Sequence, residues 1–329
     1  MNGTARHLQR MEQALKGKIL EMEAIFLAEL KESPEVVATA SRYITDAGGK
    51  RLRPLLLLLT SDLLGYRRNE RLVFAAVVEA LHTATLIHDD VIDESVLRRG
   101  RLTLHQQIGN RMSILVGDYL YAQAIRLAVR SGNVPVLEIL AEATVRLTEG
   151  EIWALDRTND PRLTLEEYLT HISKKTGCLF AAAASIPAHL AGQPRHVRRL
   201  HAFGMDFGIF FQIMDDIQDF VALEEEAGKP VLHDLEEGKV SLPVILLLQK
   251  LQGPERRELD RWIRDSARHK NAIARAVAQH GALGDTVSMA RSYAKRALRR
   301  LEPFPDGAAK QILLSLPDRL FSLPAFQRL

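Results

Sequence analysis

The sequence predicts an all-α protein that folds as one large helical bundle, and three observations support this. Long stretches of the 329 residues carry apolar side chains at a helical period, and no convincing alternating strand pattern is found. Turn-forming residues divide the chain into segments of about 15 to 30 residues, the lengths of helices in a bundle. No linker rich in proline, glycine or serine separates two parts, so residues 1–329 are expected to form a single domain.

Helix boundaries are predicted where glycine, proline and asparagine occur, because these residues interrupt helices and form turns. In chain order, the breaks are Gly48-Gly49, Gly65, Gly100, Gly132-Asn133, Asn159-Asp160-Pro161, Gly192-Gln193-Pro194, Gly228-Lys229-Pro230, Gly253-Pro254 and Pro303 to Pro305. The segment from Glu70 to about Asp93 contains no helix breaker. One uninterrupted helix is therefore expected there.

The composition favours a large globular protein and argues against a nucleic-acid binder. Hydrophobic residues make up 47% of the chain, which is enough for a large buried core. The formal net charge is +3, but lysine and arginine are spread along the chain rather than gathered in blocks. This mild basicity is compatible with an anionic substrate.

The single cysteine and the short apolar runs predict a cytoplasmic protein. Cys178 is the only cysteine, so neither an internal disulfide nor a cysteine-rich zinc site can form, and a reducing compartment is expected. Residues Met1 to Arg10 are polar and do not form a signal peptide. The longest apolar run, Leu55 to Leu59, is far shorter than the roughly 20 residues that span a bilayer, so no transmembrane segment is expected.

Two acidic clusters share the spacing DDxxD, and each lies in an apolar stretch with helical periodicity. They are Asp89-Asp90-Val91-Ile92-Asp93 and Asp215-Asp216-Ile217-Gln218-Asp219. The first and last aspartates of a cluster share one helix face, about 6 Å apart along the axis. Two such charges about 4 Å apart repel by about 4 kcal/mol at an effective dielectric constant near 20. Mg²⁺, which prefers oxygen ligands and bridges carboxylates to substrate phosphates, would remove this repulsion.

The first acidic cluster ends a mostly polar stripe along its predicted helix. The stripe consists of Glu79, His82, Leu86, Asp89 and Asp93, which follow one another at steps of three and four residues. Apolar residues flank it, namely Val77, Val78, Ala80, Leu81, Ala84 and Ile87. A polar stripe is more often a solvated helix face, but these neighbours are too apolar for an exposed helix. The stripe is therefore predicted to line an internal cleft.

Basic clusters precede and follow this helix. Lys50-Arg51-Leu52-Arg53-Pro54 comes directly after the Gly48-Gly49 pair, and Arg98-Arg99-Gly100-Arg101 comes directly after the helix. Such clusters can form surface salt bridges that contribute little to stability. Guanidinium groups also bind phosphate oxygens in a bidentate manner, and a glycine turn lets backbone N–H groups approach an anion. Together with the carboxylates, the clusters indicate a site for two phosphorylated ligands.

These motifs resemble those of the trans-polyprenyl diphosphate synthases over nearly the whole chain. In order, the matching residues are Gly48-Gly49-Lys50-Arg51-Leu52-Arg53-Pro54, His82, Asp89-Asp90-Val91-Ile92-Asp93, Arg98-Arg99-Gly100, Gly117-Asp118-Tyr119, Lys175-Thr176, Phe211-Gln212, Asp215-Asp216-Ile217-Gln218-Asp219, Gly228-Lys229-Pro230, Asp234-Leu235 and Gly238-Lys239. The run from His82 to His88 is most similar to octaprenyl and related quinone side-chain synthases. Gln218 and Ser241 depart from the family pattern, which has an aliphatic residue and threonine there.

The resemblance implies an isoprenoid synthase fold, a homodimer whose chains are helical bundles around a central cavity, with the acidic motifs facing each other across it. It assigns Mg²⁺ to four aspartates: Asp89, Asp93, Asp215 and Asp219. It assigns the allylic diphosphate to Arg98, Lys175, Thr176, Gln212 and Lys239. It assigns isopentenyl diphosphate to Lys50, Arg53, His82 and Arg99, and adds Lys229 to the substrate site. The residues expected to act in catalysis are Asp89, Asp93, Lys175, Asp215 and Lys239.

The activity implied is the Mg²⁺-dependent, head-to-tail condensation of isopentenyl diphosphate with an allylic diphosphate such as farnesyl diphosphate. The product would be a medium- or long-chain polyprenyl diphosphate, such as octaprenyl, for quinone side chains. No histidine or glutamate is clearly placed as a base, so the departing pyrophosphate is expected to take the proton. The apolar product suggests transient membrane contact during release, although no anchor is apparent.

Residues before Asp89 bear on product length, because the growing chain should extend along the helix at about 5.4 Å per turn. Short-chain members of the family carry bulky aromatic residues four or five positions before this aspartate. Here these positions are Thr85 and Ala84, which are small, and Leu81 lies eight positions before Asp89. This favours a product longer than geranylgeranyl. Residues that could form the channel floor are Phe74, Tyr119, Tyr121 and Ile125.

Several other functions account for part of these motifs. A short-chain synthase of the farnesyl or geranylgeranyl type, or one subunit of a heteromeric synthase, shares the motifs, although non-catalytic subunits usually lose acidic residues. A metal-dependent phosphohydrolase could use His82 and His88-Asp89 as ligands, but it leaves the second cluster unexplained. A cyclising terpene synthase matches poorly at that cluster and lacks the basic residues for isopentenyl diphosphate.

Overall fold

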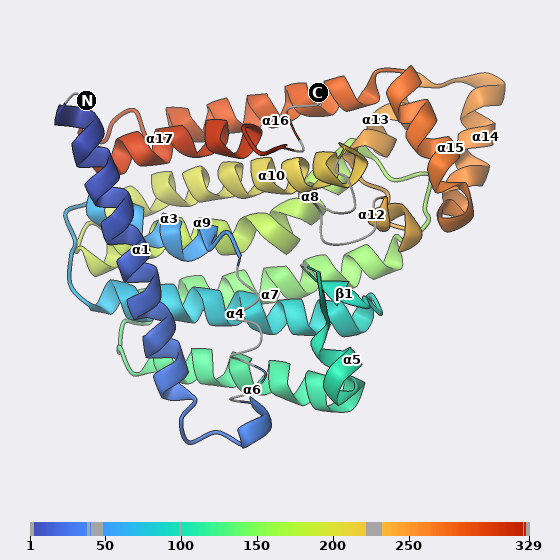
Figure 1. Ribbon diagram of the computed structural model, residues 1–329. Helices are drawn as coiled ribbons and strands as arrows, with labels where there is room; N and C mark the ends of the chain where they lie inside the picture. The colour runs from blue at the N-terminus through green and yellow to red at the C-terminus, as the bar shows by residue number, and fades with distance from the viewer. Residues whose placement is uncertain are drawn as a thin grey trace. The chain divides into compact units, whose positions relative to one another are not determined.

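The computed structural model describes residues 3–37, 40, 49–98, 100–221, 232–324 and 326, without the side chains of residues 3–10 and 12. Nearly all regular structure in this part of the chain is helical, which confirms the predicted all-α class (Figure 1). The elements in chain order are α1 (Gly3–Glu29), α3 (Leu52–Leu63), α4 (Glu70–Ile92), β1 (Leu97–Arg98), β2 (Arg101–Leu102), α5 (Leu104–Ile108), α6 (Asn110–Val129), α7 (Val134–Asp156), α8 (Leu165–Ile172), η1 (Ser173–Gly177), α9 (Cys178–Leu190), η2 (Pro194–His196), α10 (Val197–Val221), α12 (His233–Glu236), α13 (Leu242–Lys250), α14 (Gly253–Arg264), α15 (Ser266–Gln279), α16 (Ala282–Arg299) and α17 (Ala308–Phe321).

The chain divides into two compact units, which are described separately. The first unit comprises Met1–Thr144, Leu179–Gly204 and Arg300–Leu316, and the second comprises Val145–Cys178, Met205–Arg299 and Pro317–Leu329. The single domain expected for residues 1–329 stays a prediction.

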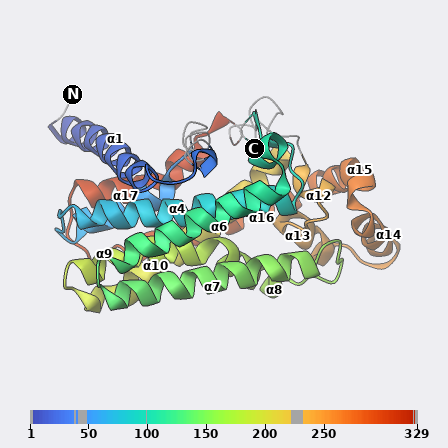
Figure 2. The same cartoon turned by 90° about the horizontal axis from the view of Figure 1, so that it is seen from below.

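Helix α4 lies at the centre of the first unit. It packs along α6 and against α3, and α1 crosses over both α3 and α4 (Figures 1 and 2). The predicted boundaries of this helix, Glu70 to about Asp93, agree with the observed ones to within one residue. By length and composition α4 could cross a bilayer, but 61% of its most apolar window is buried, as in the core helix of a globular protein.

The burial of α4 follows the pattern that the sequence indicated. The apolar residues that flank the polar stripe have exposed fractions of 2% or less: Val77, Val78, Ala80, Leu81, Ala84 and Ile87. The stripe residues themselves are half-buried: Glu79, His82, Leu86, Asp89 and Asp93. The stripe is therefore not a fully solvated face, while the cleft in front of it stays a prediction.

Where α6 packs against α4, the His88 side chain lies directly over a glycine. A Cβ atom at Gly117 would lie 2.3 Å from Nε2 of His88, well inside contact distance. The His88 ring in turn approaches α6 through the Ile114 carbonyl oxygen, at 3.2 Å, and the Asp118 carboxylate, at 3.4 Å. Gly117 thus lets α6 approach the helix turn that carries the first acidic motif.

A short antiparallel hairpin follows α4, although the sequence showed no strand. Leu97 pairs with Leu102, and Arg98 pairs with Arg101. Each strand has two residues, which is too short to produce a recognisable alternation. Gly100, a predicted break, has a φ of 74° in the turn, a left-handed conformation that glycine adopts without strain.

In the second unit, α13 packs against α8, α15 and α16, and α15 also contacts α12, α14 and α16 (Figure 1). Amphipathic sequences explain this arrangement. For example, α14 buries Leu259 and Ile263, four residues apart, on an otherwise polar helix. Predicted breaks at Asn159-Asp160-Pro161 and Gly253-Pro254 fall between helices or at a helix start, as expected.

Candidate functional site

The first acidic motif lies at the C-terminal end of α4. Asp89 and Asp93 are half-buried, whereas the middle residue, Asp90, is only 5% exposed. Nε of Arg98 donates to Oδ1 of Asp90 at 2.7 Å. Burial raises the pKa of Asp90, although the charge and hydrogen bond of Arg98 act in the opposite direction. Arg98, which was assigned to the allylic diphosphate, is thus held by the middle carboxylate of the motif.

The basic cluster before α3 divides its side chains between two kinds of partner. Arg51 adopts a left-handed backbone conformation and pairs with Glu79 at 2.7 Å and with Glu23 at 2.9 Å. The guanidinium carbon of Arg53 lies 4.5 Å from the ring centroid of the buried Phe180, a cation–π contact that orients the side chain. Lys50 is exposed, as a residue that receives an anionic ligand would be.

The second acidic motif lies near the end of α10, and its three aspartates differ in environment. Asp215 is half-buried. Asp219 is 4% exposed, and its two carboxylate oxygens accept from the backbone N–H groups of His233, at 3.1 Å, and Asp234, at 3.2 Å. This carboxylate therefore caps the start of α12, where helix N–H groups and a negative charge stabilise each other.

Asp216, the middle residue, is 3% exposed and accepts from three donors. The Tyr168 hydroxyl lies 2.6 Å and the Leu242 backbone N–H nitrogen 2.9 Å from Oδ2, and Nε2 of Gln212 lies 3.1 Å from Oδ1. Burial and the nearby Asp234 carboxylate raise the pKa of Asp216 to about 7, against the effect of these hydrogen bonds. Burial and Asp216 likewise raise the pKa of Tyr168 well above its usual value.

Gln212 and Thr176, both predicted to contact the allylic diphosphate, are brought together. The Thr176 hydroxyl donates to Oε1 of Gln212 at 2.7 Å, so the two side chains continue the network that begins at Tyr168. Thr176 and Lys175 belong to η1, a single π-helical turn between α8 and α9. Such turns are rare in helices and occur frequently at functional sites.

Two glycines allow close packing around this π-turn. A Cβ atom at Gly150 of α7 would lie 2.7 Å from the backbone nitrogen of Lys175. A Cβ atom at Gly177 would lie 2.5 Å from Sδ of Met205 in α10. The Met205 side chain can move aside, but the Lys175 backbone cannot do so easily, so the placement of Lys175 depends on Gly150.

The two lysines assigned to catalysis are both paired with carboxylates. Nζ of Lys175 lies 2.6 Å from Glu151, and Nζ of Lys239 lies 2.7 Å from Glu237. Burial, together with the charges of Lys175 and Lys239, lowers the pKa of His171 to about 4. Both lysines therefore lie close enough to His171 to act on the same imidazole, which places them in one region of the second unit.

Glu237 is half-buried and remains a strong acid. Burial works to raise its pKa, but hydrogen bonds from His233 and Lys239 and their charges outweigh this and lower it to about 2. The carboxylate is thus anionic at neutral pH and pairs with Lys239.

The carboxylates suit a Mg²⁺ site in which the substrate supplies the remaining ligands. Within the described ranges, no group of three or more histidine, cysteine, aspartate or glutamate side chains forms a ready-made metal cage. The half-buried carboxylates Asp89 and Asp93 lie one turn apart on α4. Because Mg²⁺ usually binds one or two carboxylates together with waters and substrate phosphates, an oxygen set of this size suits it.

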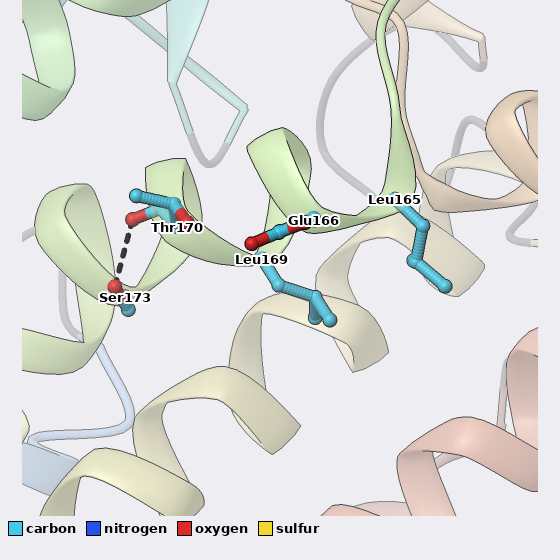
Figure 3. Close-up of a pocket in the computed structure, with 5 residues that line it drawn as sticks. All are labelled: Leu165, Glu166, Leu169, Thr170 and Ser173. Carbon is cyan, nitrogen blue, oxygen red and sulfur yellow. Dashed lines mark hydrogen bonds between the residues drawn. The ribbon is translucent and has the colours of Figure 1, made fainter.

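A hollow of about 520 Å³ lies beside α8 (Figure 3). It is lined by Leu165, Glu166, Leu169, Thr170 and Ser173. None of the predicted site residues lines it, and it has no cationic side chain that could bind a diphosphate.

The structure leaves part of the predicted site undecided. Arg99 and Lys229 lie outside the described residues. Asp89, Asp93, Arg98 and the isopentenyl-site residues Lys50, Arg53 and His82 belong to the first unit. The second motif, the π-turn and Lys239 belong to the second unit. The predicted facing of the two motifs across a cavity stays a prediction.

Three residues that hydrogen-bond to site residues were not identified from the sequence, namely Glu151, Tyr168 and Glu237, and neither was His171, whose pKa responds to Lys175 and Lys239. Glu151 and Tyr168 lie on other elements than their partners Lys175 and Asp216, so no spacing rule connects them, whereas Glu237 lies only two residues before Lys239. The motifs include Asp216 and Asp90, but the sequence did not predict that they are buried or which residues hydrogen-bond to them. Only the packed structure distinguishes these middle aspartates from their neighbours.

Comparisons with known proteins show the family of this chain. The polyprenyl synthetase family model matches residues 34–280. The chain belongs to the polyprenyl synthetase family. It is 35% identical over 314 residues to octaprenyl diphosphate synthase of Escherichia coli (strain K12), with 94% of this chain and 97% of that protein covered. It is 36% identical over 297 residues to geranylgeranyl diphosphate synthase of Methanosarcina mazei, with 88% and 90% covered.

A solved structure extends the likeness to three dimensions. Polyprenyl synthase from Caulobacter crescentus CB15, complexed with calcium and isoprenyl diphosphate, superposes with a TM-score of 0.89 at 34% identity, covering 96% of this chain and 97% of that one. The family, the fold class and the prenyltransferase class predicted from the sequence are confirmed by these comparisons.

Proposed function

We propose that this chain is a Mg²⁺-dependent polyprenyl diphosphate synthase that condenses isopentenyl diphosphate head-to-tail with an allylic diphosphate such as farnesyl diphosphate. The observation that carries the proposal is the gathering of Lys175, Thr176, Gln212 and Lys239 around the second DDxxD motif in one compact unit. Family membership supports the same activity.

In this reaction the bond between C1 and the diphosphate oxygen of the allylic substrate breaks, and the electron pair leaves with pyrophosphate. Lys175, Lys239 and Arg98 provide fixed positive charge where negative charge develops on the leaving group. Mg²⁺ held by Asp89, Asp93, Asp215 and Asp219 would act as a Lewis acid on that group. The displacement of Glu151 and Glu237 by diphosphate oxygens would keep both lysines charge-paired throughout binding.

The terminal alkene carbon of isopentenyl diphosphate then forms a bond to C1, and a proton leaves the adjacent carbon. The pyrophosphate released in the first step accepts this proton. Lys50, Arg53, His82 and Arg99 would bind the diphosphate of isopentenyl diphosphate. The cation–π contact with Phe180 supports this for Arg53, because it leaves the guanidinium oriented before a ligand arrives.

We propose a long-chain product, such as octaprenyl diphosphate, for quinone side chains. The identities to an octaprenyl and to a geranylgeranyl synthase are nearly equal, at 35% and 36%, so they do not distinguish the two product lengths. The support is therefore the small size of Thr85 and Ala84 before Asp89. The enzyme would act in the cytoplasm as a homodimer and contact membranes transiently when it releases its product.

The direct test is incubation of the purified protein with Mg²⁺, isopentenyl diphosphate and farnesyl diphosphate, followed by mass spectrometry of the products. A ladder that ends at a long polyprenyl diphosphate is expected. Termination at the geranylgeranyl species would replace the long-chain proposal with the short-chain alternative. Failure to elongate any allylic primer would contradict the proposal for this chain alone and indicate a required partner subunit.

A further inference from the structure

Asp216 is firmly held within the protein. Its carboxylate accepts from Tyr168, the Leu242 backbone and Gln212, and it is 3% exposed. A buried carboxylate that turned toward a ligand would leave these donors without their acceptor, which is costly in a buried position. Asp216 therefore has a different task from Asp215, its half-buried neighbour in the same motif.

That task follows from the hydrogen-bonding chemistry of Gln212. Oδ2 of Asp216 accepts from Tyr168 and Leu242, and Oδ1 accepts from Nε2 of Gln212, so the amide presents its NH₂ group to Asp216 and its oxygen to the Thr176 hydroxyl. The two ends of an amide have nearly the same shape, so nothing in its size would prevent the reverse orientation. Asp216 thus selects one of two orientations for the Gln212 side chain.

The selected orientation determines what a ligand can meet. The Thr176 proton is used toward Gln212, whereas one N–H of Gln212 has no hydrogen-bond partner among the residues that the structure describes. Gln212 is half-buried, so this N–H can be reached. A neutral N–H donor suits a diphosphate oxygen, and the reverse orientation would present a repelling carbonyl oxygen instead.

We propose that Tyr168 and Asp216 are positioning residues for the allylic diphosphate. The Tyr168 hydroxyl holds Asp216, and Asp216 orients Gln212 so that an amide N–H remains for the ligand. This inference rests on the proposed function, because the ligand is the allylic substrate of that reaction. Tyr168 itself acts only through Asp216 and is not a catalytic residue.

The test is a double-mutant cycle with Tyr168→Phe, Gln212→Leu and the double variant, all as full-length protein. The dissociation constant of the non-ionisable thio analogue of farnesyl diphosphate is measured with Mg²⁺, together with KM for both substrates. Loss of a hydrogen bond to a charged group predicts that Tyr168→Phe weakens analogue binding about tenfold, with KM for isopentenyl diphosphate within about twofold of the wild type. In the Gln212→Leu background, Tyr168→Phe should cause no further loss.

Tyr66→Phe is the matched control. The Tyr66 hydroxyl also donates to a carboxylate, that of Glu70, at 2.7 Å, and the residue is 9% exposed in the first unit. Its removal should change analogue binding by less than about twofold, because an effect on stability alone does not change the binding of a folded protein.

Four outcomes would overturn the inference. The first is additive losses in the double variant, and the second is unchanged analogue binding in Tyr168→Phe. The third is an equal rise of KM for both substrates with a lowered Tm, which would show a purely structural role. Elongation by the wild type with any of these results leaves the proposed function intact. A wild type that neither elongates nor binds the analogue overturns the proposed function and this inference with it.

Discussion

Nζ of Lys175 lies 2.6 Å from a carboxylate oxygen of Glu151, so a lysine assigned to the substrate diphosphate is already paired within the protein. Both side chains are largely removed from solvent, with exposed fractions of 23% for Lys175 and 13% for Glu151. An incoming diphosphate must compete with Glu151 for this ammonium group.

Glu151→Gln should therefore strengthen the binding of the allylic substrate. Removing one competing anion leaves the charge of Lys175 available, and an ion pair of about 1 kcal/mol corresponds to a roughly fivefold lower KM. Steady-state kinetics with farnesyl diphosphate measures this, and Glu149→Gln serves as the control because Glu149 pairs with Lys174 instead, at 2.9 Å. A raised KM in Glu151→Gln would show that the carboxylate positions the lysine more than it competes.

A phenylalanine before the first motif should shorten the product. Ala84→Phe is expected to stop elongation at farnesyl or geranylgeranyl length. Ala84 is fully buried, so the added ring would also overpack the core by about 1 to 3 kcal/mol. Thr85 is half-buried and lies one turn before Asp89 on its face, which makes Thr85→Phe the cleaner variant.

Product length in these variants is measured by mass spectrometry of quenched reactions, and the melting temperature checks folding. Thr85→Ser, which adds no bulk, should leave the product distribution unchanged. A full-length product from both phenylalanine variants would contradict the growth of the chain along α4.

The stability of the protein should fall as the pH falls from 6.5 towards 4. His171 has a pKa of about 4 in the folded state, lowered by burial, against 6.5 in the unfolded chain. Between these values the unfolded state binds the extra proton, so acid favours unfolding, and at pH 5 this imidazole alone contributes a loss of about 2 kcal/mol. Stability at pH above 6.5 is unaffected by this group.

Urea unfolding at pH 7.5 and pH 5 measures the effect. A His171→Gln variant, which cannot titrate, should lose less stability between the two pH values than the wild type. Equal losses in both proteins would show that His171 is not buried as a neutral ring.

Gly150→Ala should disturb the π-turn. The added methyl group would lie 2.7 Å from the backbone nitrogen of Lys175, and backbone cannot move aside as a flexible side chain can. Overpacking of this kind costs about 1 to 3 kcal/mol, and the allylic KM should rise with the displacement of Lys175.

The control is Gly284→Ala in α16, where no atom lies within 4 Å of the added Cβ. Alanine in that exposed helix position should stabilise the protein by up to about 1 kcal/mol. Thermal unfolding and allylic KM are measured for both variants. A Gly150→Ala protein with wild-type stability and KM would contradict the close packing of α7 against η1.

Removal of divalent cations should abolish elongation. The carboxylate pairs supply too few ligands for a closed metal cage, so Mg²⁺ alone is expected to bind weakly, and more tightly with the diphosphate present. Calorimetric titration of Mg²⁺ with and without the thio analogue, and assays in chelator, measure this. Elongation that persists in chelator would contradict the assigned role of the aspartates.

Much of the fold followed from the sequence because helices are local structures. The apolar period of α4 predicted its bounds to within one residue, and its flanking apolar residues are buried as expected. Several breaks between helices were also predicted, since glycine and proline act on the backbone near their own positions, although those at Gly109, Asp265 and Gly281 were not, and Gly48 and Gly228-Lys229-Pro230 lie outside the described residues. The hairpin after α4, with two residues in each strand, was not predicted, because so short a pairing depends on the turn rather than on an alternating pattern of apolar and polar residues.

The same division holds for the site. The sequence by itself determined the family, both DDxxD motifs and the cationic residues around them, because spacing along a helix places carboxylates on one face. Only the tertiary structure decided that Asp216 is buried under Tyr168, that Asp90 holds Arg98, and that Glu151 and Glu237 hold the two lysines. The partners in the Asp216–Tyr168, Asp90–Arg98 and Glu151–Lys175 pairs lie on different elements, and no periodicity within one helix encodes how those elements pack. Glu237 and Lys239 lie two residues apart, and the turn after α12 brings them together.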